Sequence, residues 1–138
     1  MDIRKFQESD RTHVIALWEW CDLVRLQNDP DRDIDLKMSF QPELFFVGTE
    51  RESIIATVMA GYEGHRGWIN YLAVDPTIQR SGNGETMMNH AEEALKNLGC
   101  VKINLQVRST NSAVLGFYDS IGYVKDEVTS LGKRLSCK

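Results

Sequence analysis

The stretch VDPTIQRSGNGETMMNHAEEAL, residues 74–95, decides how the rest of the chain is interpreted. It begins as the end of an apolar strand, passes through a turn that contains Gly82 and Gly84, and continues with helical periodicity. Glycines let a ligand approach the backbone closely, and a helix N-terminus presents unpaired N–H groups to an anion. The stretch therefore predicts a strand–turn–helix unit that can hold a phosphate.

Two familiar nucleotide motifs do not match this turn. A P-loop requires Gly-Lys-Ser/Thr, whereas Gly84 is followed by Glu85 and Thr86. A dinucleotide fingerprint requires a third glycine at position 87, which is occupied by Met87. Judged alone, the Gly-x-Gly pattern also fits a plain strand-to-helix turn.

The remaining chain alternates between β-branched or aromatic runs and amphipathic segments. The segment from 68 to 107 has the pattern strand–helix–strand, which predicts one parallel pair in a mixed sheet with a right-handed connection. The last segment predicts two closing strands or a hairpin. Strands are expected in residues 1–6, 43–49, 53–62, 68–74, 101–107 and 123–135.

Four helices are expected. The first begins at the cap Ser9 and extends to about Leu26, and the second begins at Asp29 and Pro30. The third follows the glycine turn and ends at Gly99, and a short fourth helix in residues 111–121 is stopped by Gly122. The buried faces are expected to comprise Val14, Leu17, Trp18, Cys21 and Val24 in the first helix, Met87, Met88, Ala91, Ala94, Leu95 and Leu98 in the third, and Val101, Ile103, Leu105 and Val107 in the following strand.

Composition narrows the class of protein. A length of 138 residues predicts one domain, 1–138, with a substantial core. The net charge of −4 argues against a nucleic-acid partner, and the absence of an apolar run near the roughly 20 residues of a spanning helix argues against a membrane one. Three widely spaced cysteines predict neither a disulfide framework nor a metal site. We expect a soluble cytoplasmic protein; a homodimer stays open.

The motifs in their order resemble one family. Gln79-x-x-Gly82-x-Gly84 follows the strand end LAVDP, and Asn111, Tyr118 and Gly122-Tyr123 come later. Together they resemble the GNAT superfamily of N-acetyltransferases from Met1 to Leu135, in particular its small stand-alone bacterial members. The resemblance implies an α+β (α/β) fold: a mixed, mostly antiparallel sheet of about seven strands, flanked by about four helices, with strands four and five splayed apart.

The resemblance also implies the cofactor acetyl-CoA. The backbone at the turn would hold its diphosphate, and the free edge of the fourth strand would hold its pantetheine. Arg80, Ser81, Asn83 and Glu85 depart from the usual motif, and the Glu85 carboxylate would repel the diphosphate if it pointed inward. The cofactor residues expected from the resemblance are Leu72, Ala73, Val74, Gln79, Arg80, Ser81, Gly82, Asn83, Gly84, Glu85, Thr86, Asn111 and Tyr118.

Acetyl transfer to an amine requires an acid for the leaving thiolate, a donor to the oxyanion and a neutral amine. The resemblance implies Tyr118 as the acid and a fourth-strand backbone amide near Ala73 as the donor; the alternative for Tyr118 is a core tyrosine. The fourth strand contains no acid, so the base is open, with a water-relayed Glu63 as the candidate and a solvated turn residue as its alternative.

The acceptor is a small-molecule or peptide amine that the sequence does not specify. In the implied fold its pocket lies between the first two helices and the last strands. Its candidate residues are Trp18, Asp22, Arg25, Asn28 and Tyr62. The sequence predicts direct acetyl transfer in a ternary complex, because no nucleophile–base pair is evident. The alternatives are a non-catalytic acyl-CoA sensor and an interaction domain with the same fold.

Overall fold

A computed structural model describes residues 1–79 and 81–136. The chain divides into two compact units, one from Met1 to Leu105 and a second that begins at Gln106. None of the helices in these described ranges combines the length and the apolar character that crossing a bilayer requires.

A mixed sheet forms the centre of the first unit. Its five strands follow the order β1-β2-β3-β4-β5, with the first three pairs antiparallel and β4–β5 parallel. This confirms the predicted mixed sheet and its one parallel pair. The strands are β1 Asp2–Lys5, β2 Phe45–Glu50, β3 Ser53–Tyr62, β4 Gly67–Val74 and β5 Ile103–Asn104.

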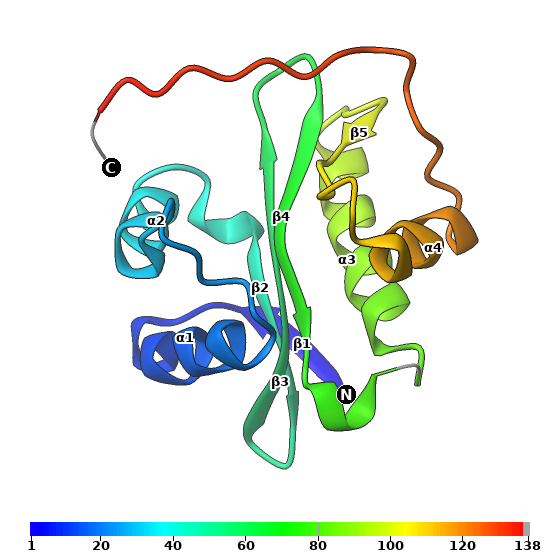
Figure 1. The fold of residues 1–138 in the computed structure, drawn as a ribbon. Coiled ribbons are helices and arrows are strands. Elements are labelled where there is room, and N and C mark those ends of the chain that lie inside the picture. The colour runs from blue at the N-terminus through cyan, green and yellow to red at the C-terminus, as the bar shows by residue number, and fades with distance from the viewer. Residues whose placement is uncertain (80, 137–138) are drawn as a thin grey trace. The chain divides into compact units, whose positions relative to one another are not determined.

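Helices cover both faces of this sheet (Figure 1). The helices α1 Arg11–Trp20 and α2 Pro30–Met38 lie on one face, and α3 Asn83–Asn97 lies on the other. Three short 3-10 segments, Glu8–Asp10, Pro42–Leu44 and Pro76–Ile78, connect helices and strands. The core under α1 and α2 comprises Phe6, Val14, Leu17, Trp18, Ile34, Phe45, Val47, Met59 and Ala73.

The helix starts show how local sequence fixes the first unit. Asp29 caps α2 as predicted, because its Oδ1 accepts a hydrogen bond from the Arg32 N–H at 3.2 Å. Ser9 does not cap α1. Instead the Asp10 carboxylate accepts from the Gln7 N–H at 2.8 Å and is held by two hydrogen bonds from the Arg4 guanidinium. The entry to α1 is therefore built around Asp10.

The first helix is shorter than the sequence predicts. It ends at Trp20, because the chain turns at Asp22, whose φ of 60° is incompatible with a right-handed helix. Leu26, the expected last residue, is fully exposed. Val14, Leu17 and Trp18 are buried as predicted, whereas Cys21 and Val24 are only partly buried.

The third helix matches the prediction closely. Met87, Met88, Ala91 and Leu95 are buried, and Gly99 takes a φ of 91° just beyond the end of the helix. Leu98 is half exposed and Val101 is 87% exposed, so the prediction that these two residues are buried is wrong. Val101 lies two residues after Gly99, and the strand begins only at Ile103.

The second unit contains α4 Ser112–Ser120. Asn111 caps it by accepting from the Val114 N–H at 3.2 Å, and the helix stops before Gly122 at φ 100°, as predicted. The closing strands are wrong: residues 123–136 contain no strand, and Val124, Val128, Leu131 and Leu135 are exposed. Alternating apolar residues favour a strand, but a strand forms only where a neighbour completes the ladder. The described residues therefore form a sheet of five strands, not about seven.

Candidate active site

A bulge interrupts β4 at its centre. The register passes from Met59↔Asn70 to Thr57↔Ala73, so Tyr71 and Leu72 together oppose Val58. Tyr71 takes a φ of 52°, in the left-handed region that a bulky residue seldom occupies. The surrounding contacts must therefore hold Tyr71 in this conformation.

A buried hydrogen-bond chain provides those contacts. The Trp18 indole N–H donates to Thr57 Oγ1 at 2.9 Å, and the Thr57 hydroxyl donates to the Tyr71 carbonyl at 2.8 Å. Trp18 and Thr57 are fully buried. The Trp18 and Tyr71 rings also stack, with centroids 3.8 Å apart and 15° between their planes. Both the side chain and the carbonyl of Tyr71 are thus fixed from the same side.

This chain sets the direction of the next backbone amide. In a trans peptide the C=O and the N–H point in opposite directions, so the Tyr71 carbonyl aimed at Thr57 turns the Leu72 N–H away from β3. The Asp75 N–H donates to the Ile55 carbonyl on β3. N–H directions alternate along a strand. The N–H of Ala73 therefore also points to β3, and the N–H of Val74 points to the same edge as that of Leu72.

That edge of β4 has little pairing. The parallel ladder with β5 consists of Gly67↔Ile103 and Trp68↔Asn104. Among the strands that the structure describes, none pairs with this edge from Ile69 to Val74. A Cβ at Gly67 would lie 2.8 Å from Cys100 Sγ, so glycine is needed where the two strands do meet. The ladder between β4 and β5 is therefore limited to two residue pairs, and the predicted splay stays a prediction.

A helix start without a side-chain cap follows the end of β4. Gly82 precedes α3 with a φ of 86° and provides no side-chain hydrogen bond. The Thr86 N–H donates to the Gly82 carbonyl, which leaves the N–H groups of Asn83, Gly84 and Glu85 pointing out of the helix. These donors and the helix dipole fit a diphosphate.

Side chains in the preceding loop hold this turn. Gln79 Nε2 donates to the Val74 carbonyl at 3.0 Å, and the Ser81 hydroxyl donates to the Ile78 carbonyl at 2.5 Å. Asn83 Nδ2 donates to Ser81 Oγ, and the Thr86 hydroxyl donates to the Gly82 carbonyl, each at 3.0 Å. The predicted cofactor residue Arg80 lies outside the described residues. The loop between β4 and α3 is thus tied to the strand end.

A pocket of about 500 Å³ lies beside the bulge on the α2 side of the sheet. The Tyr71 hydroxyl donates to Asp33 Oδ2 at 2.5 Å and accepts from Asn28 Nδ2 at 2.6 Å. Burial, with the Asp33 hydrogen bond second, raises the pKa of Tyr71 above its usual range. The pocket is lined by Asp33, Leu36, Lys37, Ser39, Phe40, Met59, Asn70 and Tyr71.

The structure brings together only some of the predicted acceptor residues. Trp18 and Asn28 contact Tyr71, although Trp18 is a core residue rather than a wall of the pocket. Asp22 and Arg25 form an exposed ion pair with each other at 3.3 Å. The Tyr62 hydroxyl donates to the Gly64 carbonyl in the β3–β4 turn. Asp22, Arg25 and Tyr62 are not among the residues that line the pocket.

Sequence reasoning missed Asp33, Lys37 and Tyr71. The four-residue spacing of Asp33 and Lys37 places both on one face of α2, which is a signal that could have linked them. Nothing in the sequence indicates that Tyr71 takes a left-handed conformation, because glycine and asparagine are the residues expected there.

Glu63 lies at the far end of β4. Its Oε1 accepts from the Arg66 N–H at 2.8 Å and closes the β3–β4 turn. Leu72 lies six positions beyond Arg66 along the chain, which corresponds to roughly 20 Å in a strand. The structure does not bring Glu63 to the bulge.

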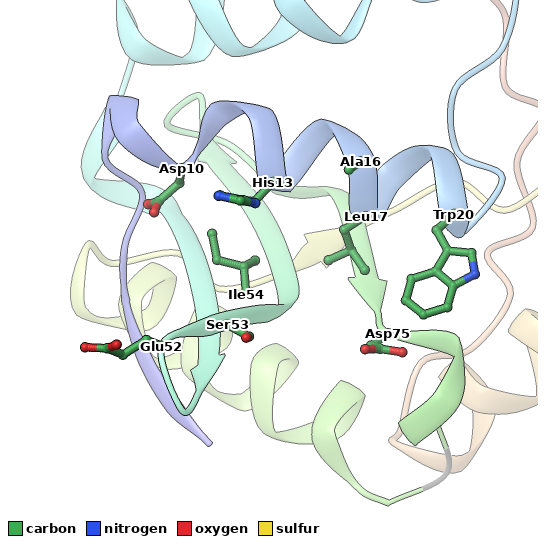
Figure 2. A pocket seen from close by; sticks show the side chains of 9 residues that line it. All are labelled: Asp10, His13, Ala16, Leu17, Trp20, Glu52, Ser53, Ile54 and Asp75. Atoms are coloured by element: carbon green, nitrogen blue, oxygen red, sulfur yellow. The ribbon is translucent and has the colours of Figure 1, made fainter.

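A second pocket, of about 400 Å³, lies between α1 and the β2–β3 turn (Figure 2). Two of its three acidic groups are used by the fold: Asp10 is paired with Arg4, and Asp75 accepts from the N–H and the hydroxyl of Thr77. Residues 1–79 and 81–136 contain no cluster of three metal-binding side chains. The pocket is lined by Asp10, His13, Ala16, Leu17, Trp20, Glu52, Ser53, Ile54 and Asp75.

Tyr118 is buried in the second unit, on α4. Its ring makes edge-on contacts with Phe117 at 5.1 Å and Tyr123 at 5.5 Å between centroids. Burial raises the pKa of Tyr118 to about 12, which keeps the hydroxyl protonated. Asn111, expected at the cofactor, serves in this unit as the cap of α4.

Comparison with known proteins identifies the class as acetyltransferase. Residues 11–123 match the family described as Acetyltransferase (GNAT) family. An acetyltransferase of Yersinia enterocolitica is 44% identical over 135 residues, which cover 98% of this chain and 96% of the relative. The chain belongs to the GNAT family of N-acetyltransferases.

Two solved structures share the fold at low sequence identity. The PaiA N-acetyltransferase of Thermoplasma acidophilum, solved with coenzyme A, has a TM-score of 0.78 at 17% identity, with 93% of this chain and 92% of that chain covered. An aminoglycoside 6'-N-acetyltransferase of Acinetobacter haemolyticus has a TM-score of 0.74 at 16% identity, with 99% and 100% covered.

Proposed function

We propose that this acetyltransferase moves an acetyl group from acetyl-CoA to a primary amine by direct attack in a ternary complex. The observation that carries the proposal is the unpaired edge of β4, which runs from the bulge at Tyr71–Leu72 towards the uncapped start of α3. The bulge provides a backbone amide in a fixed direction, and the start of α3 provides N–H donors for an anion.

The residues along this path fit acetyl-CoA, which would supply an acetyl group activated as a thioester. The edge-facing amides of Leu72 and Val74 would pair with pantetheine as a strand would. The N–H groups of Asn83, Gly84 and Glu85 would hold the diphosphate. Gln79, Ser81 and Thr86 would hold the loop in shape through their backbone-directed hydrogen bonds.

We propose the Leu72 amide as the oxyanion donor in place of Ala73. The Ala73 amide faces β3 by strand alternation, whereas the Leu72 amide is turned to the free edge by its peptide link to Tyr71. A donor fixed before the reaction stabilises developing charge without reorganisation. The buried Thr57 hydroxyl is then a positioning residue, because it holds the Tyr71–Leu72 peptide.

We propose Asp33 rather than Glu63 as the carboxylate that receives the amine. Asp33 lines the pocket beside the bulge and is bonded to the Tyr71 hydroxyl, while Glu63 closes a distant turn. A carboxylate attracts the ammonium form and accepts its proton directly or through water. Tyr118 protonates the leaving thiolate, a role supported by its place in the family motif and by burial, which keeps its hydroxyl protonated.

The proposal is tested by ligand binding and by an amine screen. Acetyl-CoA and CoA are expected to raise the melting temperature, since a ligand bound only by the native state stabilises it, and NAD and ATP are expected to act much less. An amine library assayed for free CoA thiol should yield at least one acceptor. CoA stabilisation without turnover would favour the sensor alternative, and equal shifts with all four ligands would contradict the cofactor assignment.

Thr57→Val should lower kcat about 10- to 100-fold, because the valine keeps the shape of the side chain but releases the Tyr71 carbonyl and misaligns the Leu72 amide. The KM for acetyl-CoA should change little. Thr57→Ser, which keeps the hydroxyl, should restore kcat. Steady-state kinetics on folded variants decides the matter: if serine and valine variants lose kcat equally, Thr57 acts through packing alone.

A further inference from the structure

Lys37 is a buried cation in the wall of the acceptor pocket. Its side chain is 8% exposed, and its Nζ donates one of three N–H groups to the Ala60 carbonyl. In the part of the chain that the structure describes, no carboxylate forms an ion pair with it. Burial lowers the pKa of Lys37 to about 8, and the charge of Glu43 opposes this shift. A buried charge without an opposite charge paired to it is unfavourable, so an anionic ligand would offset its cost.

Asp33 lies four residues before Lys37 on α2, a spacing at which an acid and a lysine commonly pair. Here the two side chains diverge. Asp33 accepts from Tyr71 on β4, and Lys37 donates to β3. Both line the same pocket, which therefore has one negative and one positive group that do not neutralise each other.

The rest of the pocket wall is largely apolar. Leu36, Phe40 and Met59 contribute to it, and the Phe40 ring centroid lies 6.0 Å from Lys37 Nζ. Leu36 and Phe40 are more than half exposed, so the apolar surface is accessible to a ligand. A matching ligand has an ammonium group, an anionic group and an apolar body.

We propose that the acceptor is a free amino acid with an apolar side chain, bound with its amine at Asp33 and Tyr71 and its carboxylate at Lys37. This rests on the proposed acetyl transfer at the same site. The amine nitrogen forms the new amide bond to the acetyl carbon as the carbon–sulfur bond breaks. One ammonium proton passes to Asp33 before the attack. As the amide forms, the thiolate takes the Tyr118 proton, and the second proton lost by the nitrogen returns through water to the Tyr118 oxygen. A polyamine would place a cation against Lys37, which is unfavourable.

The test compares L-leucine, L-leucinamide and spermidine as acceptors. We expect kcat/KM for leucine to exceed that for leucinamide at least about 30-fold, because the amide leaves the buried Lys37 charge unpaired. Lys37→Met should abolish this preference by raising KM for leucine, while the melting temperature stays equal or rises. Lys5→Met, at an exposed β1 position outside the pocket, is the matched control.

Calorimetric titration of L-leucine into the CoA-loaded protein separates this inference from the proposed reaction. Leucine binding that Lys37→Met abolishes supports the amino-acid site even without turnover. If Lys37→Met unfolds the chain, Lys37→Gln is used instead. A preference for leucinamide or spermidine overturns the inference but leaves the proposed acetyl transfer standing, because an amine is still acetylated. No binding of leucine also overturns the inference.

Discussion

Gly84→Val is expected to abolish stabilisation by acetyl-CoA while leaving the fold intact. Gly84 is the second residue of α3, where its N–H points to the proposed diphosphate site. Valine there places a branched side chain among the donors, and in a helix it is no worse than glycine. Acetyl-CoA at 1,000 times its Kd should stabilise the wild type by about 4 kcal/mol. Thermal melts with and without ligand should show this shift lost.

Asn89→Val is the control for that substitution, because it places valine at an exposed position farther along the same helix. It should retain the full acetyl-CoA shift. A Gly84→Val protein that melts normally and still responds to acetyl-CoA would show that the diphosphate does not bind at the start of α3.

Tyr118→Phe should lower kcat about 10²- to 10⁴-fold and change KM much less, because the hydroxyl matters while charge develops on the thiolate. Phenylalanine keeps the edge-on contacts with Phe117 and Tyr123, so folding should be preserved. Steady-state kinetics with a common acceptor provides the measurement. Tyr123→Phe, which removes a hydroxyl from the neighbouring ring, is the matched control.

The same tyrosine predicts a pH dependence. Proton donation requires the neutral hydroxyl, and burial raises the pKa of Tyr118 to about 12. The raised pKa extends the protonated form upward, so Tyr118 should cause no loss of kcat below about pH 11. A Tyr118-dependent alkaline limb near pH 9 would contradict the raised pKa, whereas an alkaline limb that persists in Tyr118→Phe would belong to another group. An unchanged rate in Tyr118→Phe would leave protonation to water.

The sequence predicted a helix boundary correctly where the residue that sets the boundary lies next to it in the chain. Asp29 with Pro30 marked the start of α2, and Gly99 and Gly122 marked the ends of α3 and α4. The end of α1 was missed, because Asp22 adopts a left-handed conformation that many other sequences would also permit. Caps and glycines thus predict an end better than periodicity alone.

Non-local pairing limited the strand prediction. The alternating pattern of residues 123–135 resembles a strand, but an edge partner determines whether a ladder forms, and β5 offers only Ile103 and Asn104. The candidate site followed the same division. The glycine turn was evident from the sequence. The grouping of Asp33, Lys37 and Tyr71 was not, because it depends on the bulge in β4 and on the packing of α2 beside a strand that is distant in the sequence.

Tyr71 joins two tasks in a single residue. Its hydroxyl is bonded to Asp33 at the pocket that we propose for the acceptor, and its carbonyl belongs to the peptide that precedes the Leu72 amide. A ligand that displaces the ring also twists that peptide, so recognition of the amine and readiness for its attack are mechanically linked. Evolution at this position cannot alter substrate choice and leave catalytic rate untouched. New acceptors would be gained more easily through Leu36 or Phe40, which line the same pocket from α2 and the residues that follow it.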